Sequence, residues 1–175
     1  MSRKRIYLLL FVSLLASSVG AQEPDLDRLN EKLRHRLETK MPGWSYERVQ
    51  PIQGSRGVLL QKWTIQNRGV SISVVDMKSA EAAKEAIQRL AHDPSTHAEL
   101  LRATGEEAYT WGYLNRQLVF RKGKTLVYVE AGADVERDPD ARTLTPVQRR
   151  AREESEVDRL RGEFVKHLLD ALDQP

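Results

Sequence analysis

The sequence contains no cysteine among its 175 residues. This absence excludes disulfide bonds, thiolate metal sites, a cysteine nucleophile and a lipid-attachment cysteine. A domain without disulfides or thiolate-bound metal must be stabilised by its hydrophobic core. The chain is long enough to build one domain of ordinary size. Aromatic residues are also scarce, at 6% of the chain, so any place where they gather is informative.

Long apolar segments are nearly absent, and the one that exists lies at the N-terminus. It runs from Ile6 to Ala16 (IYLLLFVSLLA), after three basic residues at 3–5 and before small residues that end at Ala21. The run is far shorter than the roughly 20 residues that span a bilayer. A basic, then apolar, then small-residue order is typical of a secretory signal peptide. We therefore predict a cleaved signal peptide at 1–21 and a mature chain, 22–175, that is periplasmic or secreted, with no stable membrane insertion after cleavage.

The expected mature chain has no net charge. The sequence has 28 basic and 25 acidic residues, and loss of the three bases at 3–5 leaves 25 bases against 25 acids. A neutral surface has no general attraction for phosphate backbones or anionic lipid. Nucleic acid is therefore not expected as a partner.

Apolar residues at helical spacing predict three helices. The first begins near Pro24 and ends near Lys40, with leucines recurring at steps of three and four. The second follows Ser79 as N-cap and ends near His92, and the third starts at Thr145 and Pro146.

The third helix has a charge-dense first part. Residues 148–161 are rich in both signs of charge, and its apolar face becomes continuous only from Val157. We expect 146–156 to form an extension of the single domain, 22–175. A solvated helix face is the ordinary interpretation of these charges, and a docking surface is the alternative.

Period-two alternation predicts the strands. One hairpin covers 57–77, with its connection at 67–69, and a second covers 118–131, with a glycine turn at 121–124. Short strands at Trp44 and Tyr109 complete the set. The expected fold is α+β: an antiparallel sheet of five or six strands from two hairpins, with three helices packed mainly on one face.

The motifs of common enzyme classes are missing. The chain has no serine-hydrolase elbow, phosphate loop or dinucleotide fingerprint, and its histidines lack metal-ligand spacing. Four acidic residues alternate in one loop, Asp134, Glu136, Asp138 and Asp140. Pro139 and Thr145 stand where a calcium loop of the EF-hand type needs glycine and glutamate. We predict no metal and no cofactor, with calcium binding by this loop left as an open alternative.

The scarce aromatic residues gather at Tyr109, Trp111 and Tyr113. At period two in a strand they share one face, about 7 Å apart, and Trp44 could extend the strip across the sheet. Such a strip suits a sugar or an extended peptide. Alternatively the strip packs beneath a helix, or a bulge at Gly112 breaks it.

Two functions of different classes follow. The first is a non-catalytic binding or accessory domain of the bacterial envelope that recognises a protein, a peptide or an envelope polymer. The alternative is a hydrolase acting on an envelope polymer with carboxylates drawn from Glu106, Glu107 and Glu130. Two carboxyl groups roughly 5 to 9.5 Å apart in a cleft would favour the enzyme.

One stretch resembles known sequences. It contains Gly105-Glu106-Glu107-Ala108-Tyr109, an "FRKG" segment at 120–123 and the strand residues 126–129. Over residues 104–131 the chain resembles a loose group of small exported bacterial proteins of unknown function, which carry a Gly-acid-Glu-Ala-aromatic segment before an "FRKG" hairpin. The resemblance implies an exported α+β domain, with no activity or catalytic residue attached to it.

Overall fold

The structure is a computed structural model that describes residues 23–51, 57–102 and 104–173. The expected signal peptide at 1–21 lies outside the described residues. No helix within the described part of the chain has the length and apolar character needed to cross a membrane.

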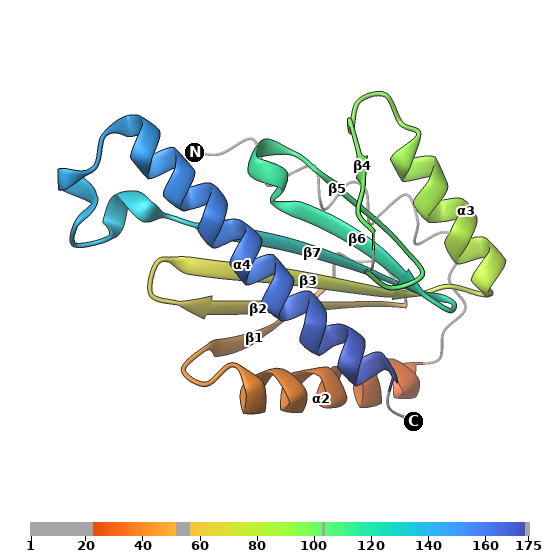
Figure 1. Cartoon of the computed structure of the whole chain (residues 1–175). Helices are drawn as coiled ribbons and strands as arrows, with labels where there is room; N and C mark the ends of the chain where they lie inside the picture. The colour runs from red at the N-terminus through yellow and green to blue at the C-terminus, as the bar shows by residue number, and fades with distance from the viewer. Residues whose placement is uncertain (1–22, 52–56, 103, 174–175) are drawn as a thin grey trace.

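The described chain forms an antiparallel sheet of seven strands in the order β1-β2-β3-β7-β6-β5-β4 (Figure 1). Consecutive strands pair within two groups, β1 to β3 and β4 to β7, and the pairing of β3 with β7 joins the groups. The strands are β1 (Ser45–Val49), β2 (Val58–Ile65), β3 (Arg68–Asp76), β4 (Glu99–Leu100), β5 (Glu107–Trp111), β6 (Gln117–Lys122) and β7 (Thr125–Ala133).

The α+β class and the antiparallel sheet are confirmed, whereas the expected number of strands, five or six, is wrong. The additional strand is β4, which has only two residues, both exposed. A segment this short carries no alternation, so period two could not reveal it.

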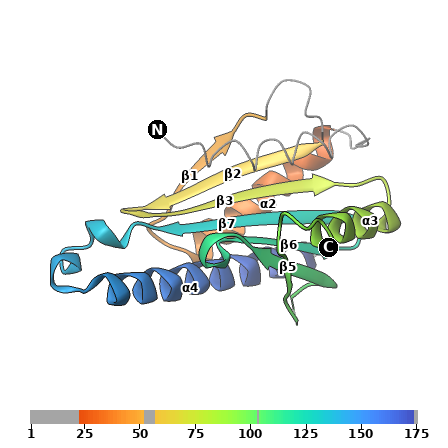
Figure 2. The ribbon, with the colours of Figure 1, turned by 90° about the horizontal axis from the view of Figure 1, so that it is seen from above.

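Within the described residues three α-helices cover the sheet, as predicted: α2 (Glu23–Lys40), α3 (Ala80–Ala91) and α4 (Pro146–Asp173). The helices α2 and α4 pack on one face, and α4 runs along that face of the twisted sheet (Figure 2). The helix α3 packs on the opposite face. Two of the three helices therefore share a face, and the sheet is covered from both sides.

Strand alternation explains the two cores. On β7, Val127 and Val129 point to α2 and α4, whereas Leu126 and Tyr128 point to α3. The larger core, on the α2 and α4 side, contains the biggest fully buried side chains of the described residues: Trp63, Phe120 and Phe164.

The turn between β2 and β3 differs from its prediction at 67–69. Ile65 pairs with Arg68, so Gln66 and Asn67 form the connection, and Gln66 has a φ of 50°. The left-handed position is therefore Gln66, and Gly69 lies inside β3. As a result Arg68 is the first residue of a strand, held in register with its neighbours.

The buried side chains of α4 begin at Val157. Before it, the Thr145 Oγ1 atom accepts a hydrogen bond from the Gln148 N–H at 3.3 Å, which caps the helix, and Val147 is 78% exposed. These first turns lie beside two short 3-10 helices, η4 (Val135–Arg137) and η5 (Ala141–Thr143), at one end of the sheet (Figure 1). This end carries the candidate site.

Candidate functional site

The predicted aromatic residues occupy different faces of the sheet. Tyr109 and Trp111 are partly buried on the α3 side, against its core. Trp44 lies on the other side, where its ring is 4.9 Å from Phe164 in an edge-on contact. Trp44 therefore does not extend the strip that begins at Tyr109.

Tyr113 leaves the strip because the strand ends before it. Gly112 has a φ of 83°, β5 stops at Trp111, and Tyr113 begins the short helix η3 (Tyr113–Asn115). Tyr113 is 52% exposed, and the centre of its ring lies 5.3 Å from the Arg116 guanidinium and 5.8 Å from that of Arg150 on α4. The sequence offered a bulge at Gly112 as an alternative, whereas in the structure the strand ends there.

The carboxylates of the hydrolase hypothesis are spread over the sheet. Glu106 and Glu107 both pair with Arg121, and the Tyr109 hydroxyl donates to Glu107 at 2.9 Å. Arg121 pairs across the strands with Leu126 of β7. Glu130 lies four residues further along β7, which corresponds to about 13 Å at strand spacing. The register thus separates Glu130 from the other two.

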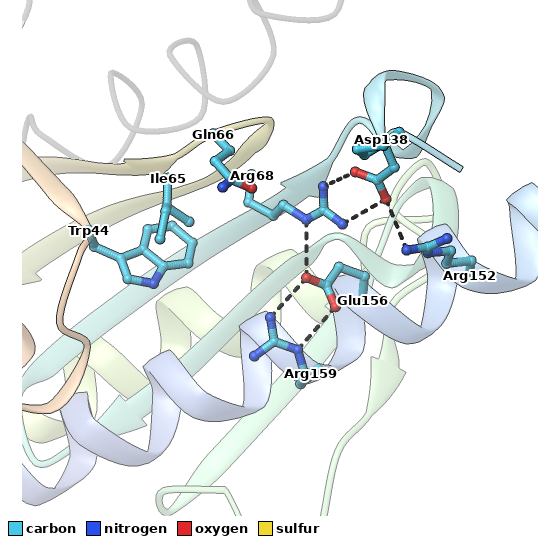
Figure 3. A pocket seen from close by; sticks show the side chains of 9 residues that line it. Trp44, Ile65, Gln66, Arg68, Asp138, Arg152, Glu156 and Arg159 are labelled. Atoms are coloured by element: carbon cyan, nitrogen blue, oxygen red, sulfur yellow. Dashed lines mark hydrogen bonds and ion pairs between the residues drawn. The ribbon is translucent and has the colours of Figure 1, made fainter. Parts of the chain in front are cut away.

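A hollow of about 430 Å³ lies where four distant segments meet (Figure 3). Trp44 comes from the turn after α2, and other segments are the β2–β3 turn, the loop after η4, and α4. Its volume falls in the range of small-ligand pockets, roughly 300 to 1,000 Å³. The lining residues are Trp44, Ile65, Gln66, Arg68, Asp138, Pro139, Arg152, Glu156 and Arg159. Of the predicted binding residues, Trp44 is the one found here.

The α4 side of the hollow follows from helical spacing. Arg152, Glu156 and Arg159 stand at i, i+4 and i+7, so their side chains project from one face of the helix. Since this part of α4 precedes its continuously buried face, these side chains meet the loop and the β2–β3 turn rather than the core.

Arg68 and Asp138 form the most buried ion pair of the hollow, with side chains 14% and 7% exposed. The guanidinium donates from Nη1 to Oδ1 at 2.5 Å and from Nη2 to Oδ2 at 3.0 Å, a bidentate arrangement. The Asn67 amide adds a bond to Oδ1 at 2.6 Å. The hydrogen bonds from Arg68 and then Asn67 hold the pKa of Asp138 well below its ordinary value.

Glu156 extends this network of ion pairs on α4. It accepts two bonds from Arg159, at 2.8 and 3.0 Å, and one from the Arg68 Nε at 3.1 Å. These bonds, Arg159 first, lower the pKa of Glu156. On the other side Arg152 lies 3.4 Å from Asp138 and 2.7 Å from Asp140. The charges therefore alternate in sign around the hollow (Figure 3).

The carboxylates of the acidic loop considered for calcium are paired with arginines. Asp134 pairs with Arg137 at 2.9 Å and Glu136 with Arg149 at 3.8 Å, while Asp138 and Asp140 belong to the network above. Over 23–51, 57–102 and 104–173, no three His, Asp or Glu side chains are grouped as metal ligands.

Sequence reasoning reached the hollow only in part. It selected Trp44 as an aromatic residue, and it offered the charge-dense stretch 148–161 as a docking surface, which contains the three α4 residues. It placed Arg68 in a turn and Asp138 in a solvated loop. No local pattern signals their contact, because they are 70 positions apart in the chain.

No protein-family model matches the chain, and comparison with curated proteins and with solved structures also gave no match. The functional argument therefore rests on the fold and on the hollow.

Proposed function

We propose that the protein is an exported, non-catalytic binding or accessory domain of the bacterial envelope, and that it recognises a protein, a peptide or an envelope polymer at the hollow beside Trp44. The observation that carries the proposal is the gathering of an indole and a ring of charged hydrogen-bonding groups around about 430 Å³ of space. Ligand sites combine apolar walls with placed polar groups, and here Trp44, Ile65 and Pro139 supply the apolar wall of a mostly charged lining.

A binding role suits the charged groups better than acid–base catalysis. A general acid or base works best when its pKa lies near the operating pH. Asp138 and Glu156 have pKa values lowered by their arginine partners, which moves them away from neutrality. Both act as fixed acceptors that orient guanidinium groups.

The hydrolase alternative gains no support from the described residues. Arg121 engages both Glu106 and Glu107, and none of the three proposed glutamates lines the hollow. Export remains part of the proposal because of the basic, apolar and small-residue order at 1–21.

Binding and hydrolysis are separable in one experiment. Protein purified after expression of the full chain is mixed with insoluble cell-wall polymer, and separately with an array of extended peptides, and the bound fraction is measured. We expect Arg159→Gln to weaken binding about tenfold, since a charge-assisted hydrogen bond is worth about 1.4 kcal/mol or more. Arg142→Gln, an exposed arginine of η5 outside the hollow, is the matched control and should bind as wild type does.

Mass spectrometry of the supernatant tests the alternative. Polymer recovered uncleaved supports a binding domain. Soluble fragments that disappear with Glu107→Gln, together with normal binding by Arg159→Gln, would replace the proposal by the hydrolase.

A further inference from the structure

A groove of about 480 Å³ lies between the C-terminal half of α4 and the segment that follows β4. Gly162, Val165 and Leu169 line it from α4, where they stand at i, i+3 and i+7 and so share one side of the helix. Leu101, just after β4, and Leu118 of β6 line it from the sheet. This α4 groove is separate from the hollow described above, since the two have no lining residue in common.

The wall of the α4 groove that these leucines and the valine form is aliphatic. Leu118 and Val165 are buried in the larger core, whereas Leu101 and Leu169 are only partly buried against it. Part of the apolar surface of Leu101 and Leu169 therefore faces the groove rather than the protein. An aliphatic ligand that covers this surface is removed from water, which is favourable in proportion to the area covered.

Gly162 keeps the α4 groove open. It lies in the interior of a helix, where glycine is less favourable than every residue except proline. A Cβ at this position would have nothing within 4 Å, so no close approach of another segment requires a glycine here. Its φ is not in the left-handed region either. The absent side chain leaves space beside Leu169, and we take this space as the place of a ligand chain.

The charges around the α4 groove, counted together with their partners, leave one cation over. Each of the three carboxylates in the lining is paired with a cation: Asp158 with Arg161, Asp170 with Arg36, and Asp173 with Lys122. Lys166 also lines the groove, and it belongs to none of the ion pairs formed within the described part of the chain. Four cations thus meet three carboxylates, and the excess positive charge lies at Lys166. A ligand with one negative charge balances it.

We infer that the α4 groove binds an aliphatic monocarboxylate. Its chain lies against Leu101 and Leu169 in the space beside Gly162, and its carboxylate meets Lys166. The chain supplies most of the affinity, because an ion pair with an exposed lysine contributes little. This ligand is a small molecule that occupies a second site, so the inference goes beyond the proposed function and does not depend on it.

Probes of different chain length test the aliphatic part. The purified protein is titrated with octanoate and hexanoate by calorimetry, and the amide signal of Gly162, assigned by Gly162→Ala, reports the place of binding in nuclear magnetic resonance spectra. Octanoate should bind about tenfold more tightly than hexanoate, because two more methylene groups leave water. Equal affinities, or no saturable shift of the Gly162 signal, would overturn the inference.

Filling the space at Gly162 separates binding from stability. Gly162→Leu should weaken octanoate binding about tenfold or more, because the new side chain occupies the groove. It should not lower the urea midpoint of unfolding, since the space is open and leucine favours a helix. Gly162→Ala, the smaller change, should raise that midpoint and weaken binding about threefold. Wild-type affinity in both variants would overturn the inference.

Probes of different charge test the carboxylate. Octanoate should bind about threefold more tightly than neutral octanamide, as expected for an exposed ion pair, and octylammonium should bind more weakly than both. Lys166→Gln should abolish the difference between acid and amide, whereas Lys84→Gln, an exposed lysine of α3, should leave it unchanged. Equal binding of the three probes, or the same preference in Lys166→Gln, would overturn the inference.

Discussion

Arg68, the first residue of β3, and Asp138, in the loop after η4, form a bidentate ion pair across 70 positions of the chain. The pair attaches the loop to the edge of the hairpin, directly against the first turns of α4. Glu156 of α4 also contacts Arg68, so one guanidinium joins a strand, a loop and a helix. The shape of the hollow depends on these contacts of Arg68 with Asp138 and Glu156.

Removal of the carboxylate should therefore destabilise the domain. Asp138→Asn leaves the mostly buried Arg68 guanidinium with Glu156 as its remaining carboxylate, and we expect a loss of about 2 to 3 kcal/mol in the free energy of unfolding. Asp140→Asn is the control, because Asp140 is 58% exposed and such pairs contribute about 0.5 kcal/mol or less. Urea unfolding measures the free energy of unfolding of both variants. Equal losses would show that the Arg68–Asp138 pair does not hold the loop, the strand and the helix together.

The same carboxylate predicts how stability depends on pH. Its pKa is lowered in the folded protein by hydrogen bonds from Arg68 and Asn67, whereas an unfolded aspartate titrates near about 3.9. The stabilisation is therefore complete above the unfolded pKa and is lost progressively as the pH falls below it. Between pH 5 and 3, wild type should lose more unfolding free energy than Asp138→Asn. Parallel curves for the two proteins would contradict this assignment.

The tryptophans should differ in their contribution to stability. Trp63 is fully buried and its indole donates to the Gln61 Oε1 at 3.1 Å, so Trp63→Ala should cost about 3 to 5 kcal/mol. Trp111 is partly buried at the edge of the α3 core, and Trp111→Ala should cost about 1 to 2 kcal/mol. Thermal and urea unfolding compare them. An unchanged stability of Trp111→Ala combined with weakened binding would support the aromatic strip instead of the hollow.

Two glycines with positive φ provide a matched test of the turn before β5. A Cβ at Gly105 would lie 2.7 Å from the Arg121 carbonyl oxygen, whereas at Gly123 nothing lies within 4 Å. Both alanine variants bear the cost of a left-handed conformation, about 1 kcal/mol. Gly105→Ala adds a backbone clash and should lose at least about 1 kcal/mol more. Similar unfolding free energies for the two variants would mean that Gly105 is not tightly enclosed.

Local periodicity was sufficient to predict most of the fold. The leucine spacing of α2, the Ser79 cap of α3 and the Thr145–Pro146 start of α4 are local signals, and the helices begin and end close to the predicted residues. The strand β4 was missed because two residues show no period. The placement of α3 on the opposite face depends on which face α2 and α4 leave open, and that is a property of the assembled sheet.

The site was less predictable because it depends on contacts between distant segments. Trp44 was identified by its residue type alone. The predicted strip failed at Gly112, where a φ of 83° ends the alternation before Tyr113. Arg68 and Asp138 came together through the pairing of β3 with β7 and the path of the following loop, which no local pattern records.

The central claim is that partners bind at the hollow rather than on the α3 side of the sheet. The most direct measurement is a residue-by-residue map of amide and indole chemical shifts while soluble fragments of the cell-wall polymer, or array-selected peptides, are added to the purified protein. The account predicts that the largest changes centre on Trp44, Arg152 and Arg159, with Trp111 unchanged. Changes centred on Tyr109 and Trp111, with Trp44 and the α4 arginines unaffected, would contradict it.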